Sequence, residues 1–352
     1  MKSLINVIIV DDSKVCTTLL NAILESEPSI NVLACASDGM EALALTKALK
    51  PDLVIMDIFM PKMDGVKATQ AIMEQCPTPI LIISSSPNNA ESDYVFEAIE
   101  AGALAFIEKP RGVLTDGFGE VERLIIYSIK ALADVHVIRR RIQTDRIPPP
   151  APKVEVKNTL GAKILALGSS LGGPETLRYI ISALPATFPM PIIVTQHITK
   201  GFLPGMIKWL QRTSKVTLQI VSHYQKLYPG NVYFAADDHH LIIKKNVTPI
   251  ALLDNRNLVE GFRPAINAMF SSLASSYPNE SIGGLLTGMG KDGAEGLLKM
   301  KETGCITFAQ SKATSIVYGM PGSAVSMNAA LYSIDLEKIP EFLTTIKEIR
   351  RK

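Results

Sequence analysis

The chain has 352 residues, which is long enough for two domains that each bury a core of their own. Hydrophobic residues make up 47% of it and charged residues 20%, a composition that excludes a disordered or fibrous protein. No apolar run approaches the roughly 20 residues of a membrane helix, and the N-terminus lacks the layout of a signal peptide. The four cysteines show no C-x-x-C pair and no metal-ligand spacing. We therefore expect a cytoplasmic protein without direct membrane insertion or a disulfide framework.

The formal net charge of +2 conceals two halves of opposite sign. Residues 1–134 carry 10 basic and 19 acidic side chains, a balance of −9, and the remaining residues carry 26 and 15, a balance of +11. Opposite charges of this size favour contact between the halves, or attraction of the second half to an acidic partner. Two unrelated domains also differ in charge by chance, so the asymmetry alone does not choose a function.

Short apolar runs alternate with amphipathic segments through the first 131 residues. Strands are predicted at residues 6–10, 30–36, 52–57, 80–84 and 104–107, with helices between them. Five such units in sequence predict an α/β domain with a doubly wound, mostly parallel sheet.

Polar side chains stand where these predicted strands end. Asp11, Asp12 and Asp57 follow the first and third strands, and three carboxylates in one pocket require a cation. Hard oxygen ligands with an incomplete shell suit Mg²⁺, which keeps waters and bridges to a phosphoryl group. Ser84 and Lys109 end the fourth and fifth strands and offer a hydroxyl and a cation to phosphoryl oxygens. Any one of these residues alone is more often a helix cap or a solvated turn residue, but five at strand ends favour a site.

Residues 4–131 closely resemble a response-regulator receiver domain. The resemblance rests on D-D, on D-I-F-M-P-x-M-D-G, on the serine that ends the fourth strand and on K-P. It implies that Asp57 accepts a phosphoryl group from a chemotaxis histidine kinase, and that Asp11 and Asp12 help hold the Mg²⁺.

The same resemblance assigns the phosphate-responsive residues. Ser84 and Lys109 contact the phosphate, and Phe106 occupies the aromatic position that reorients. The peptide bond between Lys109 and Pro110 is expected to be cis. These roles are carried over from the family and do not follow from spacing.

A proline-rich stretch separates the two halves. An amphipathic helix is predicted over residues 118–140, and residues 147–152 (I-P-P-P-A-P) form a semi-rigid extended spacer. We therefore predict a receiver domain at 1–134, a linker at 135–160 and a second domain at 161–352. Three arginines at 139–141 suit a helix C-terminus, and no helix-turn-helix or zinc-finger pattern follows, which disfavours a nucleic-acid partner.

The stretch 163–174 (K-I-L-A-L-G-S-S-L-G-G-P) predicts a strand, a glycine-rich turn and a helix. Ser170 fits the G-x-S-x-G elbow, in which a serine is lifted toward a substrate and a base. A phosphate-binding loop is a second interpretation, although Ser170 replaces the middle glycine of G-x-G-x-x-G. In the simplest interpretation Ser169 or Ser170 is only a helix N-cap.

Two further predicted strands end beside candidate catalytic groups. Residues 191–196 run into His197, and residues 281–287 run into a glycine-rich turn that contains Asp292. If these strands are parallel neighbours of the one before Ser170, a hydroxyl, an imidazole and a carboxylate converge as in acyl transfer. A lone histidine or aspartate in such a place is usually structural, and the chain order differs from that of the common serine hydrolases.

Residues 237–240 (D-D-H-H) present four consecutive metal-ligand types. Adjacent residues of an extended segment point to opposite faces, so at most two share a site. No i, i+4 or C-x-x-C partner completes a shell, and a metal site is not favoured.

The second half resembles the catalytic domain of the chemotaxis receptor methylesterases, the CheB family. The match runs from about residue 163 to 333 through G-S-S-L-G-G, T-Q-H, P-G-N-V-Y-F-A, L-L-T-G-M-G-K-D-G-A-x-G and Y-G-M-P-x-x-A. It implies a Rossmann-like domain in which Ser170 is the nucleophile, His197 the general base and Asp292 its orienter. Backbone N–H groups of Leu171 and Met289 would form the oxyanion hole.

The family implies a phosphorylation-regulated serine esterase. Its substrates are glutamate methyl esters on the cytoplasmic helices of chemoreceptors, methanol is released, and receptor glutamines are plausible targets of deamidation. The esterase reaction needs no cofactor.

Three stretches depart from the family pattern. Leu171 replaces a threonine, residues 235–240 lose a proline, and residues 262–267 read F-R-P-A-I-N where H-R-P-S-x-D is usual. The alternative function is therefore a catalytically weakened, receiver-coupled interaction module in chemosensory signalling.

Overall fold

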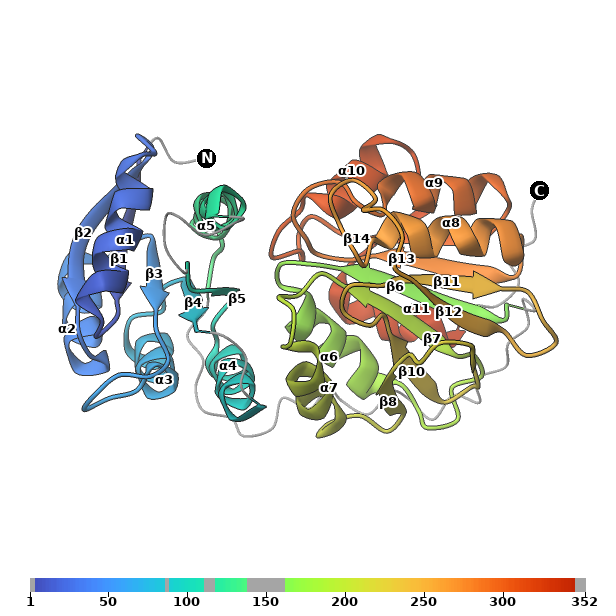
Figure 1. Cartoon of the computed structure of the whole chain (residues 1–352), viewed down its shortest axis with the longest axis horizontal. Helices are drawn as coiled ribbons and strands as arrows, with labels where there is room; N and C mark the ends of the chain where they lie inside the picture. The colour runs from blue at the N-terminus through green and yellow to red at the C-terminus, as the bar shows by residue number, and fades with distance from the viewer. Residues whose placement is uncertain (1–3, 86–88, 111–117, 138–161, 346–352) are drawn as a thin grey trace. The chain divides into compact units, whose positions relative to one another are not determined.

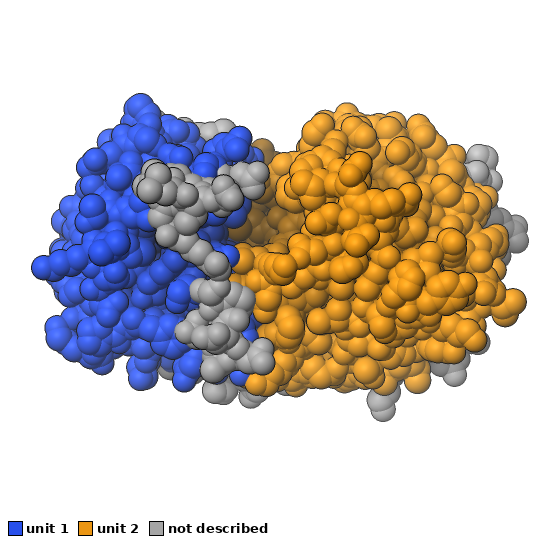
Figure 2. All heavy atoms as spheres, in the orientation of Figure 1, with its two compact units in different colours: residues 1–145 blue, residues 146–352 orange. Residues whose placement is uncertain are grey.

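The protein divides into two compact units, residues 1–145 and 146–352 (Figure 2). The structure is a computed structural model that describes residues 4–85, 89–110, 118–137 and 162–345. Within these ranges, no helix combines the length and the apolar character that crossing a membrane requires. The predicted spacer at 147–152 lies outside the described residues, and the predicted domain limits stay predictions.

The first unit is a five-stranded parallel sheet with helices on both faces (Figure 1). The strands run in the order β2-β1-β3-β4-β5, with bounds β1 Ile5–Val10, β2 Ile30–Ala36, β3 Leu53–Met56, β4 Ile80–Ser84 and β5 Ala105–Glu108. The helices are α1 Lys14–Glu25, α2 Gly39–Leu49, α3 Gly65–Gln75, α4 Asn89–Ala101 and α5 Phe118–Leu132. α1 packs beside α5, whereas α2, α3 and α4 pack in a row.

Burial explains why these segments form a doubly wound sheet. All four residues of β3 and the last four of β1 are buried, as expected of strands that helices cover on both faces. Aspartates fix helix starts: the Asp38 side chain accepts hydrogen bonds from two N–H groups of α2, and Asp64 accepts one from α3. The predicted α/β fold is confirmed.

The helix predicted at 118–140 is shorter in the structure. α5 ends at Leu132, which is the last residue of its apolar stripe, and residues 135–137 are not helical. Val135 and Val137 are β-branched and favour a helix less than the residues before them.

The second unit contains a seven-stranded sheet in which every pair is parallel, in the order β15-β14-β13-β6-β7-β10-β8. Its strands are β6 Ile164–Ser169, β7 Ile192–Gln196, β8 Thr217–Ile220, β10 Asn231–Phe234, β13 Ser281–Leu285, β14 Ile306–Gln310 and β15 Tyr332–Ile334. The α-helices are α6 Gly173–Ala183, α7 Leu203–Gln211, α8 Ile266–Ser276, α9 Ala294–Glu302, α10 Met320–Ser326 and α11 Ile339–Thr345, and a short 3₁₀ turn, η1, spans Leu336–Lys338. α8, α9 and α10 pack together, and α6 contacts both α7 and α11 (Figure 1).

A small antiparallel sheet was not predicted from the sequence. It consists of β9 Gln225–Lys226, β11 His240–Lys244 and β12 Ile250–Asp254, in the order β11-β12-β9. The apolar run at 241–243 indicated β11, but β9 is only two residues long and carries no periodic pattern.

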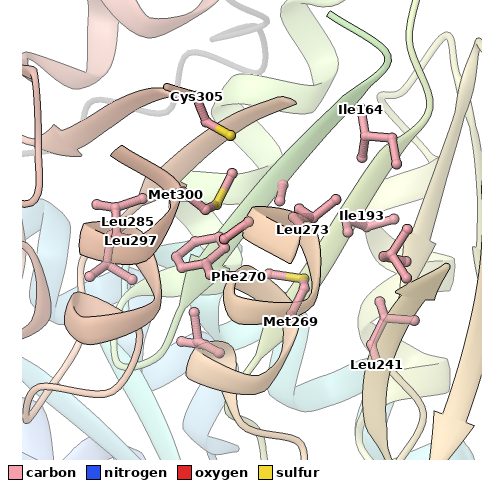
Figure 3. Packing of buried hydrophobic residues seen from close by; sticks show 14 of the residues in the cluster. Ile164, Ile193, Leu241, Met269, Phe270, Leu273, Leu285, Leu297, Met300 and Cys305 are labelled. Atoms are coloured by element: carbon pink, nitrogen blue, oxygen red, sulfur yellow. The ribbon is translucent and has the colours of Figure 1, made fainter. Parts of the chain in front are cut away.

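Helix α8 joins the main sheet to this small sheet. Met269, Phe270 and Leu273 of α8 are fully buried in a cluster that also includes Ile193 of β7 and Leu241 of β11 (Figure 3). Such packing fixes the position of the helix and therefore of its N-terminus. That N-terminus contributes to the site described next.

Candidate functional site

The first unit gathers charged groups at the carboxyl edge of its sheet. Asp11 follows β1, Asp57 follows β3 and Lys109 follows β5. The Lys109 ammonium lies 2.8 Å from an Asp11 carboxylate oxygen and 2.9 Å from an Asp57 oxygen, and both carboxylates are almost fully buried. One buried cation therefore neutralises only part of the charge of two buried anions.

These residues fit a divalent cation. Asp11, Asp12 and Asp57 offer carboxylate oxygens within 4.8 Å of one another, which is a hard oxygen donor set. Ser84, at the end of β4, has a fully buried hydroxyl without a hydrogen-bond partner in the described structure. A buried orphan hydroxyl beside a charged pocket is suited to a phosphoryl oxygen.

The pocket also shifts proton affinities. Burial raises the pKa of Asp57 to about 6, although Lys109 opposes the rise. Burial would lower the pKa of Lys109, but hydrogen bonds and charge from the two carboxylates outweigh it and raise that pKa. The rise at Asp57 therefore comes from burial, whereas the rise at Lys109 comes from the two carboxylates that it contacts.

The remaining receiver predictions have mixed outcomes. The Phe106 ring of β5 packs edge-on against Phe96 of α4, with ring centroids 5.6 Å apart. The expected cis bond before Pro110 is wrong: among the described residues the cis peptide is Arg263–Pro264. The trans isomer is intrinsically favoured for an X–Pro bond. With this bond trans, the Lys109 ammonium contacts the carboxylates of both Asp11 and Asp57.

In the second unit, Ser170 lies in a sharp turn between β6 and α6. Its N–H donates to the Thr287 carbonyl at 3.0 Å, beside the end of β13. Gly172 is the N-cap of α6, with φ of 77° and no side-chain capping bond. The simplest interpretation of this turn, a serine N-cap, is therefore wrong. A positive φ at this point requires glycine, and it leaves Ser170 half-buried ahead of the helix.

Gln196 ties this turn to the end of β7. Its amide nitrogen donates to the carbonyls of Ser170 and His197, each at 2.8 Å, and its oxygen accepts from the Ser169 hydroxyl. The amide lies so close to Gly173 that an added Cβ there would clash with it. The sequence analysis missed this role, although the T-Q-H motif contained the residue.

The adjacency expected of the three strands is confirmed, because β13, β6 and β7 are consecutive neighbours. His197 Nε2 lies 2.9 Å from Asp292 Oδ2, and the two side chains are 10% and 1% exposed. The distance is that of a hydrogen bond, but the oxygen lies off the ring's N–H direction, so neither ring nitrogen has an aligned partner among the described residues.

Asp292 is held by the N-terminus of α8. Its two carboxylate oxygens accept from the N–H groups of Ile266 at 2.7 Å and Asn267 at 2.9 Å. Asp292 therefore caps the N-terminus of α8, which lies earlier in the chain, and also contacts His197. The two backbone hydrogen bonds fix the position of the carboxylate beside the imidazole.

Ser170 and His197 share this edge without a direct hydrogen bond. In the described structure His197 Nδ1 is buried and has no hydrogen-bond partner. Catalytic hydrogen bonds are often absent before substrate binds and form in the complex.

The predicted oxyanion donors lie close to Ser170. A Cβ added at Gly288 would stand 2.8 Å from Ser170 Cβ and 3.1 Å from its nitrogen, so the 288–290 turn touches the serine. Among described residues, the N–H groups of Leu171 and Met289 donate to no other group. Two free N–H donors beside a serine are what an oxyanion hole requires.

Residues 262–267, which depart from the family pattern, surround His197 and Asp292. The Phe262 ring stacks on the His197 imidazole, with centroids 4.2 Å apart and planes 4° apart. The Asn267 amide oxygen accepts from the Gly296 N–H at 2.7 Å, and so ties α8 to α9. Phe262 and Asn267 are functional candidates that sequence reasoning missed.

The D-D-H-H stretch has other partners. The His240 ring accepts from the Ala265 N–H at 3.2 Å and lies 3.0 Å from the Asn257 carbonyl, so backbone groups contact both ring nitrogens. Asp237 accepts from the Gly201 N–H, and Asp238 pairs with Lys200. These side chains hold loops in place.

Both units match models of known protein families. The family model for CheB methylesterase matches residues 165–343, and that for the response regulator receiver domain matches residues 7–114. A relative from Syntrophus aciditrophicus, named protein-glutamate methylesterase/protein-glutamine glutaminase 1, is 42% identical over 97% of this chain and 98% of its own. One from Nitrosospira multiformis, named protein-glutamate methylesterase/protein-glutamine glutaminase, is 40% identical over 97% of both chains.

A solved structure also matches the second unit. The crystal structure of the Thermotoga maritima CheB methylesterase catalytic domain is 37% identical, covers 53% of this chain and 99% of its own, and has a TM-score of 0.52. The chain therefore belongs to the CheB methylesterase family and carries a response regulator receiver domain before the methylesterase domain.

Proposed function

We propose that the protein is a protein-glutamate methylesterase that hydrolyses glutamate methyl esters on chemoreceptor cytoplasmic helices, under control of phosphorylation at Asp57. The observation that carries the proposal is the His197–Asp292 contact at the sheet edge that also presents Ser170. The relatives' names supply the substrate class.

In the proposed reaction, the Ser170 oxygen attacks the ester carbonyl while its proton passes to His197. The carbonyl oxygen becomes an oxyanion beside the N–H groups of Leu171 and Met289. The tetrahedral adduct collapses, the C–O bond to the methoxy group breaks, and the His197 proton leaves with it as methanol. Water then hydrolyses the acyl-serine by the same proton path.

We assign the proton transfer to Nδ1 of the imidazole. Nε2 lies 2.9 Å from Asp292, and Nδ1, which is buried and has no partner in the described structure, would take the Ser170 proton. The Asp292 carboxylate, held by two backbone N–H groups, stabilises the imidazolium that results. No electrophilic or redox group is needed for these steps.

A side-chain amide presents the same carbonyl to Ser170, with ammonia in place of methanol as the leaving group. The glutaminase part of the relatives' names supports deamidation of receptor glutamines as a second activity of the same site.

In the receiver, Asp57 would take the phosphoryl group from a chemotaxis histidine kinase. Asp11, Asp12 and Asp57 would hold Mg²⁺, which when bound neutralises charge on the phosphoryl oxygens. The Ser84 hydroxyl and the Lys109 ammonium would then bind the phosphoryl oxygens.

Methanol release from a methylated chemoreceptor fragment tests the proposal. Release that is fast with the native protein and absent with Ser170→Ala supports it. A native protein that binds the fragment but releases no methanol would instead indicate an interaction module, which the departures at 262–267 would explain.

A further inference from the structure

We propose that Phe262 is a positioning residue that holds the His197 imidazole in its reactive orientation by stacking on it. The inference rests on the proposed function of His197 and deepens it. It starts from the parallel rings, 4.2 Å apart and inclined by 4°, in a segment where the family pattern has another residue.

The imidazole needs such a restraint. The χ2 torsion of histidine is broad, so hydrogen bonds from the ring nitrogens usually fix the ring. Neither nitrogen of His197 makes an aligned hydrogen bond to a described residue, although Nε2 lies 2.9 Å from Asp292. Rotation about χ2 would tilt the ring out of the plane of Phe262, and the stack opposes that tilt.

Phe262 is itself fixed by a tight hairpin. Val259 and Phe262 exchange two backbone hydrogen bonds at 3.1 and 3.0 Å across the turn residues Glu260 and Gly261. Both turn residues have positive φ, 51° and 85°, the combination of a type I′ turn. Glycine adopts this conformation freely, but glutamate is strained in it, and such strain persists where the surroundings fix it.

The surroundings that fix Glu260 also hold the rest of the site. One carboxylate oxygen accepts from the Asn267 amide at 3.2 Å, and the other lies 3.4 Å from the Lys291 ammonium. Asn267 also donates its backbone N–H to Asp292. The contacts therefore form a closed path from Asp292 through Asn267, Glu260 and the hairpin to Phe262, and back to His197.

The stack also suits the chemistry of the ring. Once the imidazole takes the Ser170 proton it becomes a cation, and the face of an aromatic ring attracts a cation. Phe262 is 39% exposed, so the ring shields one face of His197 without sealing the site. Stacking and cation attraction together are expected to raise kcat by roughly tenfold.

Three variants at position 262 distinguish the effect of a planar aromatic ring from that of side-chain volume. Phe262→Ala removes the ring, Phe262→Leu keeps bulk without a planar face, and Phe262→Tyr keeps the face. We expect kcat for methanol release to fall roughly tenfold in the first two, with KM nearly unchanged, and to recover in the third. Leu258→Ala is the matched control, because it removes another exposed apolar side chain from the same loop.

Two further readouts do not depend on receptor substrate. Labelling of Ser170 by an organophosphonate should slow in the Ala and Leu variants, and the imidazole C–H resonances of His197 should lose the ring-current shift of a stacked neighbour. Melting temperatures close to the native value should show that these variants are folded.

The outcomes distinguish the two proposals. The positioning role is overturned, and the esterase proposal stands, if the native protein releases methanol and Phe262→Ala has the same kcat. The same holds if Phe262→Tyr lowers kcat as much as Phe262→Ala does. A native protein with neither methanol release nor Ser170 labelling overturns both.

Discussion

The two candidate sites occupy the same place in two similar sheets, yet they are built differently. In the receiver, Asp11, Asp57 and Lys109 all come directly from strand ends of one sheet, and the Lys109 ammonium contacts both carboxylates. In the esterase unit, two of the three groups follow strands, but their support comes from the hairpin at 259–262 and the start of α8. The receiver site can therefore be recognised from residues at strand ends, whereas the esterase site also depends on packing between segments that are far apart in the sequence.

The largest effect should come from the proposed nucleophile. Ser170→Ala is expected to lower kcat by roughly 10⁴-fold or more, because no other group would form the acyl intermediate. The double variant Ser170→Ala/His197→Ala should lose little more, since the residues act as a unit. Methanol release under saturating substrate checks both, and additive losses would contradict a shared mechanism.

The receiver should respond as sharply to loss of its acceptor. Asp57→Asn should abolish Mg²⁺-dependent labelling by a small phosphodonor, and Asp12→Asn should weaken the dependence on Mg²⁺. Intact-mass measurement before and after acetyl phosphate gives the result. Labelled Asp57→Asn protein would mean that the acceptor is another residue.

A smaller loss is expected at the turn that touches Ser170. Gly288→Ala places a methyl group 2.8 Å from Ser170 Cβ and also against Met320, so the turn or the serine must shift. A displacement of about 1 Å lowers turnover by up to roughly 100-fold.

The control for this variant is Gly119→Ala, where an added Cβ meets nothing within 4 Å. The kcat for methanol release is measured for both variants. Equal values would show that the turn at 288–290 accommodates the added methyl group without loss of turnover.

The smallest effect is on stability and belongs to the receiver. Folding raises the pKa of Asp57 to about 6 from an ordinary 3.8, so ionisation destabilises the folded unit as pH rises from about 4 to about 6. Asp57→Asn should therefore raise the receiver's melting temperature at pH 7.5 in chelator and make little difference near pH 4.

Calorimetry with a spectroscopic control checks this expectation. The single tryptophan, Trp209, lies in the second unit, so its fluorescence transition should not change. Mg²⁺ should stabilise the native receiver and have less effect on the variant. A lower melting temperature for Asp57→Asn in chelator would show that the ion pair with Lys109 outweighs desolvation.

Much of the fold was predictable because parallel strands covered on both faces read as apolar runs. β1, β3, β6 and β7 were all located this way, and acids follow β1 and β3. The small antiparallel sheet was missed because β9 has two residues and pairs only through tertiary contact.

The site was predictable only in part. Ser170 and His197 directly follow strands, and Asp292 lies in the glycine-rich turn after a third strand, so chain order and motif indicate all three. Phe262 and Asn267 were visible only as departures from a family pattern. Their contacts depend on a two-residue turn and on where α8 begins, and no periodicity in the sequence encodes either.

The most direct measurement is methanol release from a methylated chemoreceptor fragment by the full chain, with and without Mg²⁺ and a phosphodonor. We expect release that depends on Ser170 and rises on phosphorylation of Asp57, with no rise in Asp57→Asn. Release that persists in Ser170→Ala, or no release by the phosphorylated native protein, would contradict it.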